Sequence, residues 1–89
     1  MGARVLLADD DPSLREVVRY ALDRAGFEVI EAGDGRQALD RFRQHAVDLV
    51  VLDVLMPELD GLEVCRELRK ASRVPIVFLS SRGENGFAR

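Results

Sequence analysis

Apolar residues gather in four short stretches of the chain, and longer amphipathic stretches separate them. Three of the four are continuous apolar runs, too short for a helix, which is typical of strands buried on both faces of a sheet. The remaining one alternates apolar and acidic residues, which is typical of an edge strand. The expected strands are Val5–Ala8, Phe27–Glu31, Leu49–Leu52 and Val74–Leu79, of which the second is the alternating one.

Each stretch between these strands carries apolar residues at helical spacing. The first expected helix starts at Pro12, has Asp11 as its cap and stops at Gly26. The second and third follow Asp34 and Asp60, each with a Gln or Glu three positions later that gives the spacing of a capping box. Their apolar positions are Leu14, Val17, Val18, Ala21, Leu22 and Ala25, then Ala38, Leu39 and Phe42, then Leu62, Cys65 and Leu68.

Strand and helix therefore alternate along the chain in the order β-α-β-α-β-α-β. This alternation predicts an α/β fold in which helices cover the faces of a parallel sheet. With 89 residues the chain is one domain at most, and no linker or low-complexity stretch divides it. Residues 82–89 show no periodicity, so we expect a flexible C-terminal tail there.

Composition narrows the class of protein. The net charge is −3 and no basic run occurs, which argues against direct nucleic-acid binding. Cys65 is the single cysteine, so an intramolecular disulfide is impossible, and its helical position predicts a small core residue. No apolar stretch reaches the roughly 18 residues of a membrane span, and no signal peptide is visible. A cytoplasmic location is the expectation.

Candidate chemistry collects where the strands end. Asp9–Asp11 follow the first strand, Asp53 follows the third, and Ser80 and Ser81 follow the fourth. The carboxyl ends of parallel strands lie at one edge of the sheet, where ligands of such folds bind. Crowded carboxylates repel one another unless some are protonated or a cation binds, and oxygen-only ligands favour Mg²⁺, or Mn²⁺.

Magnesium and carboxylates together suggest phosphoryl chemistry. A carboxylate can itself be the nucleophile and form an aspartyl-phosphate, and the Ser80 hydroxyl is placed to hydrogen-bond the phosphoryl group. Other acidic residues have simpler explanations, because Asp11, Asp34 and Asp60 are expected to be helix caps. His45 is expected to be a solvated residue at a helix end without a catalytic role.

Four segments carry a resemblance to a known family. They are "VLLADDDPSLRE", "EAGDGRQAL", "DLVVLDVLMPELDGLEVCRELR" and "VPIVFLSS". At these residues, and essentially from Arg4 to Ser81, the sequence resembles the receiver domain of bacterial two-component response regulators. The core of the resemblance is an apolar run, an Asp, a Met-Pro pair and an Asp-Gly pair at fixed spacing. The resemblance implies a flavodoxin-like, CheY-like doubly wound parallel sheet with strand order 2-1-3-4-5.

The resemblance also implies roles for individual residues. Asp53 would be the phosphoacceptor and a metal ligand. Asp9 and Asp10 would be the acid pair of the metal site, with Asp10 the more direct ligand. Leu55 would supply its backbone carbonyl to the metal.

Other roles implied by the resemblance concern the loops. Ser80 would be the switch hydroxyl that turns toward the phosphoryl group. Ser81 would be the small residue that admits the phosphodonor. Pro57 and Gly61 would be the turn formers that shape the loop after Asp53.

One part of the family pattern is absent from the sequence. Receiver domains continue with a helix, a fifth strand and a last helix, and a Lys beside the fifth strand pairs with the acceptor. No Lys follows Lys70 here. On this basis residues 1–81 are interpreted as a receiver domain truncated after the fourth strand, without the face that normally signals.

Several functions remain open from the sequence. The first is a phosphoacceptor, not an enzyme beyond its own phosphorylation and dephosphorylation, that serves a histidine kinase or phosphotransfer protein. The second is a truncated or engineered fragment, a pseudo-receiver, that forms a homodimer or higher oligomer through the exposed fourth strand and the third helix. A haloacid-dehalogenase-type hydrolase is disfavoured because Leu55 stands where a second Asp is needed. A flavodoxin-like ligand-binding domain lacks a phosphate-cradling loop after the first strand.

Overall fold

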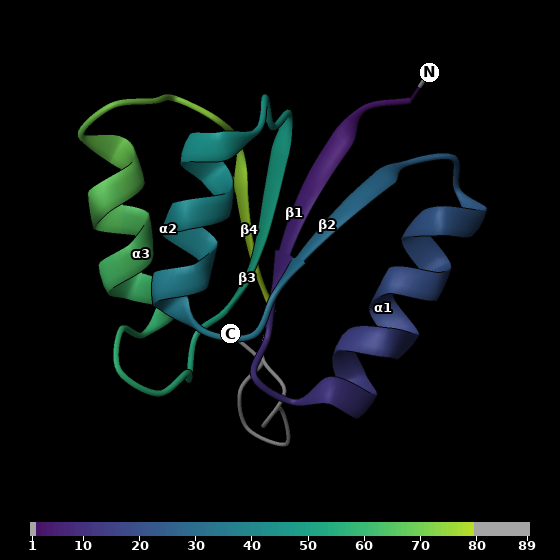
Figure 1. The fold of residues 1–89 in the computed structure, drawn as a ribbon, viewed down its shortest axis with the longest axis horizontal. Helices are drawn as coiled ribbons and strands as arrows, with labels where there is room; N and C mark the ends of the chain where they lie inside the picture. The colour runs from purple at the N-terminus through teal and green to yellow at the C-terminus, as the bar shows by residue number, and fades with distance from the viewer. Residues whose placement is uncertain (1, 80–89) are drawn as a thin grey trace.

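Strands and helices alternate along the chain as the apolar pattern predicts (Figure 1). The computed structural model describes residues 2–79. Ser80, Ser81 and the tail expected at 82–89 lie outside these residues. The elements are β1 (Arg4–Ala8), α1 (Pro12–Arg24), β2 (Glu28–Ala32), α2 (Gly35–Gln44), β3 (Leu49–Asp53), α3 (Gly61–Arg69) and β4 (Ile76–Leu79).

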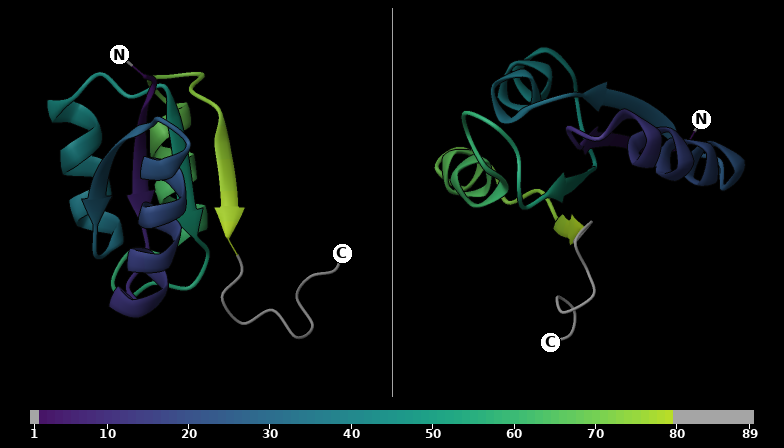
Figure 2. Two further views of the ribbon diagram at one scale, coloured as in Figure 1. Left: turned by 90° about the vertical axis from the view of Figure 1, so that its right-hand side faces the viewer. Right: turned by 90° about the horizontal axis from the view of Figure 1, so that it is seen from below.

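The four strands form one parallel sheet in the order β2-β1-β3-β4, which confirms the expected fold class. Helices α2 and α3 lie on one face of the sheet and α1 lies on the other (Figure 2). In the register of the sheet, Ala8 of β1 is opposite Leu52 of β3. The next residue of each strand is an aspartate, so the register alone places two carboxylates side by side.

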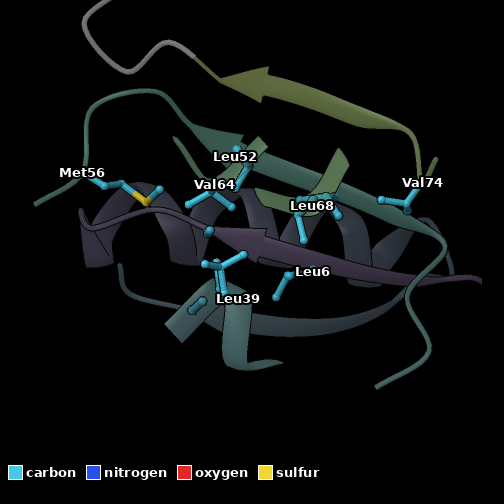
Figure 3. Packing of buried hydrophobic residues seen from close by; sticks show 11 residues of the cluster. Leu6, Leu39, Leu52, Met56, Val64, Leu68 and Val74 are labelled. Atoms are coloured by element: carbon cyan, nitrogen blue, oxygen red, sulfur yellow. The ribbon is translucent and has the colours of Figure 1, made fainter. Parts of the chain in front are cut away.

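Two apolar clusters hold the layers together, one on each face of the sheet. Successive strand residues point to opposite faces, so Leu6 and Ala8 enter the larger cluster while Val5 and Leu7 enter the smaller one beneath α1. Full burial of such a side chain contributes about 1.5–3 kcal/mol. Figure 3 shows the larger cluster between the sheet and helices α2 and α3, with Leu6, Leu39, Leu52, Met56, Val64, Leu68 and Val74 labelled.

All three helices begin at the predicted caps. The side chains of Asp11, Asp34 and Asp60 each accept a hydrogen bond from a backbone N–H of the first turn. The expected capping boxes are incomplete, because neither side chain three positions after the cap accepts from the N–H of its cap residue. Gln37 Oε1 accepts from the Gly33 N–H instead, and Glu63 pairs with Arg66. Within residues 2–79, no helix has the length and apolar character needed to cross a bilayer.

The helical apolar pattern does not match burial everywhere, because Val17, Ala21, Ala25 and Leu62 are exposed. Val17 is 65% exposed, because α1 turns it away from the sheet and packs through the half-buried Val18 and Leu22. In α3 the expected Leu62 is exposed and Val64 is buried instead. Helix α3 packs against α2, and its Val64 and Leu68 also enter the larger cluster with residues of the sheet, so these positions face inward.

The expected bounds of all four strands need correction. Strand β1 begins one residue earlier, at Arg4, and β3 ends one residue later, at Asp53. Strand β2 is displaced by one residue from the predicted range. Strand β4 begins at Ile76, because Pro75 has no backbone N–H to donate to the neighbouring strand. The Pro75 carbonyl still accepts a hydrogen bond from the Val50 N–H of β3. Val74 is therefore buried in the core rather than part of the edge strand.

Candidate functional site

Three aspartates converge at the carboxyl edge of the two central strands. Asp9 follows β1 directly and Asp53 is the last residue of β3, so the parallel register brings their side chains together. Asp10 follows in the loop that leads into α1. One carboxylate oxygen from each of these three residues lies within 4.8 Å of the other two. The structure therefore gathers the three acidic side chains that the sequence pattern singled out.

Two of these carboxylates are buried. Asp9 is 0% exposed and Asp53 is 1% exposed, whereas Asp10 faces solvent. Asp9 Oδ1 accepts a hydrogen bond from the Asp11 N–H at 2.9 Å, and Asp53 Oδ1 accepts from the Leu55 N–H at 3.3 Å. Among the described residues, Oδ2 of Asp9 and Oδ2 of Asp53 have no hydrogen-bond partner. Burying an unpaired carboxylate oxygen is costly, so these atoms are suited to a ligand that compensates their charge.

The protonation of Asp53 reflects this crowding. Burial is the largest influence, and the negative charges of Asp9 and Asp10 act in the same direction. Together they raise the pKa of the Asp53 carboxyl from 3.8 to about 6, against the opposing hydrogen bond from the Leu55 N–H. The three carboxylates together therefore favour a ligand that brings positive charge.

The donor set fits a hard divalent cation. All three side chains offer oxygen atoms, and Mg²⁺ is held in proteins by one or two carboxylates together with waters and substrate phosphates. The two unpaired buried oxygens point to the same requirement as the raised pKa of Asp53. The carbonyl of Leu55, expected as a further ligand, remains a prediction.

The loop after Asp53 is held tightly to the end of β3. The Gly61 N–H donates to the Val54 carbonyl at 2.9 Å, which returns the chain to the strand at the start of α3. A Cβ atom on Gly61 would fall onto the carbonyl oxygen of Asp53, so a side chain here would displace the strand end. Pro57 lies in the same loop and its carbonyl accepts from the Leu59 N–H at 2.7 Å.

The remaining sequence candidates are distributed as follows. Ser80 and Ser81 lie outside the described residues, so their expected roles remain predictions. Asp11 caps α1, and His45 lies exposed at the end of α2. Cys65 is half-buried against the larger cluster. None of these three contributes to the group of carboxylates.

Comparison with known proteins identifies the family. The sequence matches the response regulator receiver domain over residues 5–89. The chain belongs to this family. As a receiver domain it is a signalling domain of two-component systems, and the parallel sheet with three helices agrees with the fold of the solved receiver domains that it matches.

Curated relatives are longer than this receiver domain. The probable transcriptional regulator ycf27 of Porphyra purpurea is 49% identical over 81 residues, which are 91% of this chain and 33% of that protein. The chain spans about a third of the length of the curated relatives it matches.

Two solved structures are informative for the site. One is the receiver domain of a sensor histidine kinase from Pseudomonas aeruginosa, with a magnesium ion coordinated in the active site cleft. It has a TM-score of 0.87 and 31% identity over 97% of this chain and 73% of that one. The other is a complex of a histidine kinase with a response regulator from Thermotoga maritima, with a TM-score of 0.82 and 39% identity over 89% of this chain and 69% of that one.

Proposed function

We propose that this receiver domain is a cytoplasmic phosphoacceptor that takes a phosphoryl group from a histidine kinase or phosphotransfer protein onto Asp53. The observation that carries the proposal is the pair of buried, unpaired Oδ2 atoms of Asp9 and Asp53. The kinase complex and the magnesium-bound receiver domain among the similar structures support it. We assign the domain no enzymatic activity beyond its own phosphorylation and dephosphorylation.

In the proposed reaction, an oxygen of the Asp53 carboxylate forms a bond to phosphorus while the bond from phosphorus to the donor's leaving atom breaks. The buried position of Asp53 restricts the access of water to the acyl phosphate. Asp9, Asp10 and Asp53 would hold Mg²⁺, or Mn²⁺, which supplies positive charge to the phosphoryl oxygens.

Three further roles complete the proposal. The Leu55 carbonyl would add a ligand to the metal. Ser80 would hydrogen-bond the phosphoryl group as the switch hydroxyl. Ser81 would leave room for the donor to approach.

The experiment that tests the proposal is labelling with acetyl phosphate in the presence of Mg²⁺. We expect one phosphoryl group on Asp53, removable by hydroxylamine and detected by mass spectrometry. Asp53→Asn should abolish labelling, whereas Asp34→Asn, which removes a capping carboxylate away from the site, should leave it intact. A labile phosphate that persists in Asp53→Asn would contradict the assignment of the acceptor.

Binding of Mg²⁺ is a separate prediction. Titration should stabilise the fold by mass action, because the ion binds the assembled carboxylates of the native state. Asp10→Asn should weaken this binding about tenfold. Asp40→Asn removes the same charge from an exposed site on α2 and is the matched control. Equal Mg²⁺ affinity of wild type and Asp10→Asn in calorimetry would show that Asp10 is not a ligand.

Self-assembly is the second candidate function, and the edge strand β4 favours it. Among the described residues β4 pairs only with β3, so within this part of the chain its outer backbone groups face no other strand, the arrangement that favours pairing with another chain. Val77 is 49% exposed and Phe78 is 41% exposed, on opposite faces of the sheet. Burial of several hundred Å² of such surface offers roughly 10 kcal/mol before the costs of association.

We therefore expect a dimer or higher oligomer of this chain at micromolar concentration, formed through β4 and the adjacent α3. Val77→Lys should convert it to a monomer, because a lysine on an edge strand opposes strand pairing. Val17→Lys places the same charge at the exposed valine of α1 and should leave the assembly unchanged. Sedimentation velocity measures the outcome, and a wild-type monomer would rule the assembly out.

A further inference from the structure

Arg15 of α1 joins three elements at the edge of the acidic site. Its Nη1 donates a hydrogen bond of 2.7 Å to the backbone carbonyl of Asp9, and its Nε donates one of 2.9 Å to Glu31 Oε1 on β2. The side chain is mostly covered, with 22% exposed. The sequence pattern gave this residue no role, since a basic side chain early in an amphipathic helix is usually a solvated one.

The hydrogen bond from Arg15 is one of several that hold Asp9 in place. The Asp9 N–H donates to the Ala32 carbonyl at the end of β2 at 3.1 Å, while the Asp9 carbonyl accepts from Arg15. The Asp9 carboxylate in turn accepts from the Asp11 N–H at 2.9 Å. Both peptide groups of Asp9 are thus anchored, and the bond from Arg15 is charge-assisted and short.

By its charge alone, the Arg15 guanidinium disfavours the binding of a cation to the nearby carboxylates. A cation beside a cation-binding site lowers the affinity of that site for a second cation. Glu31 offsets part of this effect, since it pairs with Arg15 at 2.9 Å and also with Arg19 at 3.3 Å. Arg19 has a partner in Asp23 and has no hydrogen bond to Asp9.

We propose that Arg15 is a positioning residue of the phosphoacceptor site, which fixes the main chain at Asp9 so that the carboxylates of Asp9 and Asp10 are held in place for a divalent cation. The proposal rests on the proposed function, because it concerns the same cation. The proposal predicts a change in Mg²⁺ affinity that is opposite in sign to the change expected from charge alone. Removing Arg15 weakens Mg²⁺ binding, although the loss of a nearby positive charge by itself would strengthen it.

The test compares the Mg²⁺ affinity of Arg15→Gln, Arg15→Lys and Arg19→Gln in titrations with the metal alone. Arg15→Gln should weaken binding about tenfold, as is typical for outer contacts of metal ligands. Arg19→Gln removes the same charge from the same Glu31 pair and should bind Mg²⁺ as tightly as wild type or more tightly. Arg15→Lys keeps one donor for the Asp9 carbonyl and should restore part of the affinity.

A second readout needs no metal. Hydrogen exchange at the Asp11 amide should accelerate in Arg15→Gln and stay unchanged in Arg19→Gln, because only the former releases the loop. Arg15→Gln binding Mg²⁺ as tightly as Arg19→Gln would overturn the positioning role, and Arg15→Met, which also has no charge and has no donor, provides the same comparison if the glutamine variant does not fold. A wild-type chain that binds no Mg²⁺ would overturn the proposed function and this inference together.

Discussion

Asp53→Asn should make the metal-free protein more stable at about pH 8, by about 3 kcal/mol in the free energy of unfolding. The rise in the pKa of Asp53 from 3.8 to about 6 means that the folded state binds the proton more tightly than the unfolded chain. The wild type therefore loses stability as the pH rises through this window, and the loss is complete above it. Asparagine resembles the neutral carboxyl and has no such cost.

The gain should depend on pH in a defined way. Below about pH 3 Asp53 is protonated in both states, so the two proteins should have similar stability in urea unfolding. Asp40→Asn, on the exposed face of α2, should change stability by less than about 0.5 kcal/mol at any pH. Saturating Mg²⁺ should reduce or reverse the stability gain of Asp53→Asn, because the ion stabilises the folded wild type, which binds it, more than the variant. No gain in stability at high pH without metal would show that ionised Asp53 is not destabilising.

The parallel sheet and the acidic edge follow from features that the sequence displays openly, whereas the strand order came from the family resemblance. The unalternated runs before Asp9 and Asp53 are too short for helices and typical of strands covered on both faces, and parallel pairing then places their following residues at one edge. Helix starts were equally visible, because Asp11, Asp34 and Asp60 each satisfy a free N–H of the first turn whatever the tertiary context.

Helix faces were less predictable than helix starts. Val17 and Leu62 have apolar side chains at plausible spacing, yet both are exposed in the structure. The angle at which a helix meets the sheet and its neighbour decides which flank of an apolar stripe is buried, and spacing along the chain does not contain that angle.

The electrostatics of the site depend on distances that the sequence does not contain. Charge crowding among Asp9, Asp10 and Asp53 was inferred from their types, but the raised pKa of Asp53 requires its burial as well. The contact of Arg15 with the Asp9 carbonyl joins a helix to a strand end through a backbone atom. Side-chain identity gives no signal for such a contact, because any residue offers a carbonyl.

Gly61 occupies a position where space, rather than backbone freedom, requires glycine. It is the first residue of α3 and is buried against the end of β3. A Cβ atom there would fall onto the Asp53 carbonyl oxygen and would approach Val54 Cα to 3.0 Å. Because these are main-chain atoms of the last residue of β3 and of the residue after it, no side-chain rotation can relieve the overlap.

Gly61→Ala is therefore expected to destabilise the protein by about 3 kcal/mol, although alanine is the better helix former by roughly 1 kcal/mol. It should also weaken Mg²⁺ binding, because the end of β3 that must move carries the Asp53 carboxylate. Gly33→Ala is the matched control for stability, since its Cβ would meet only side-chain atoms, the nearest being Arg15 Nη1 at 3.4 Å. Urea unfolding of both variants and Mg²⁺ titration of Gly61→Ala beside the wild type measure the two effects. A Gly61→Ala protein as stable as Gly33→Ala would show that the strand end yields easily and that the close approach does not fix the position of Asp53.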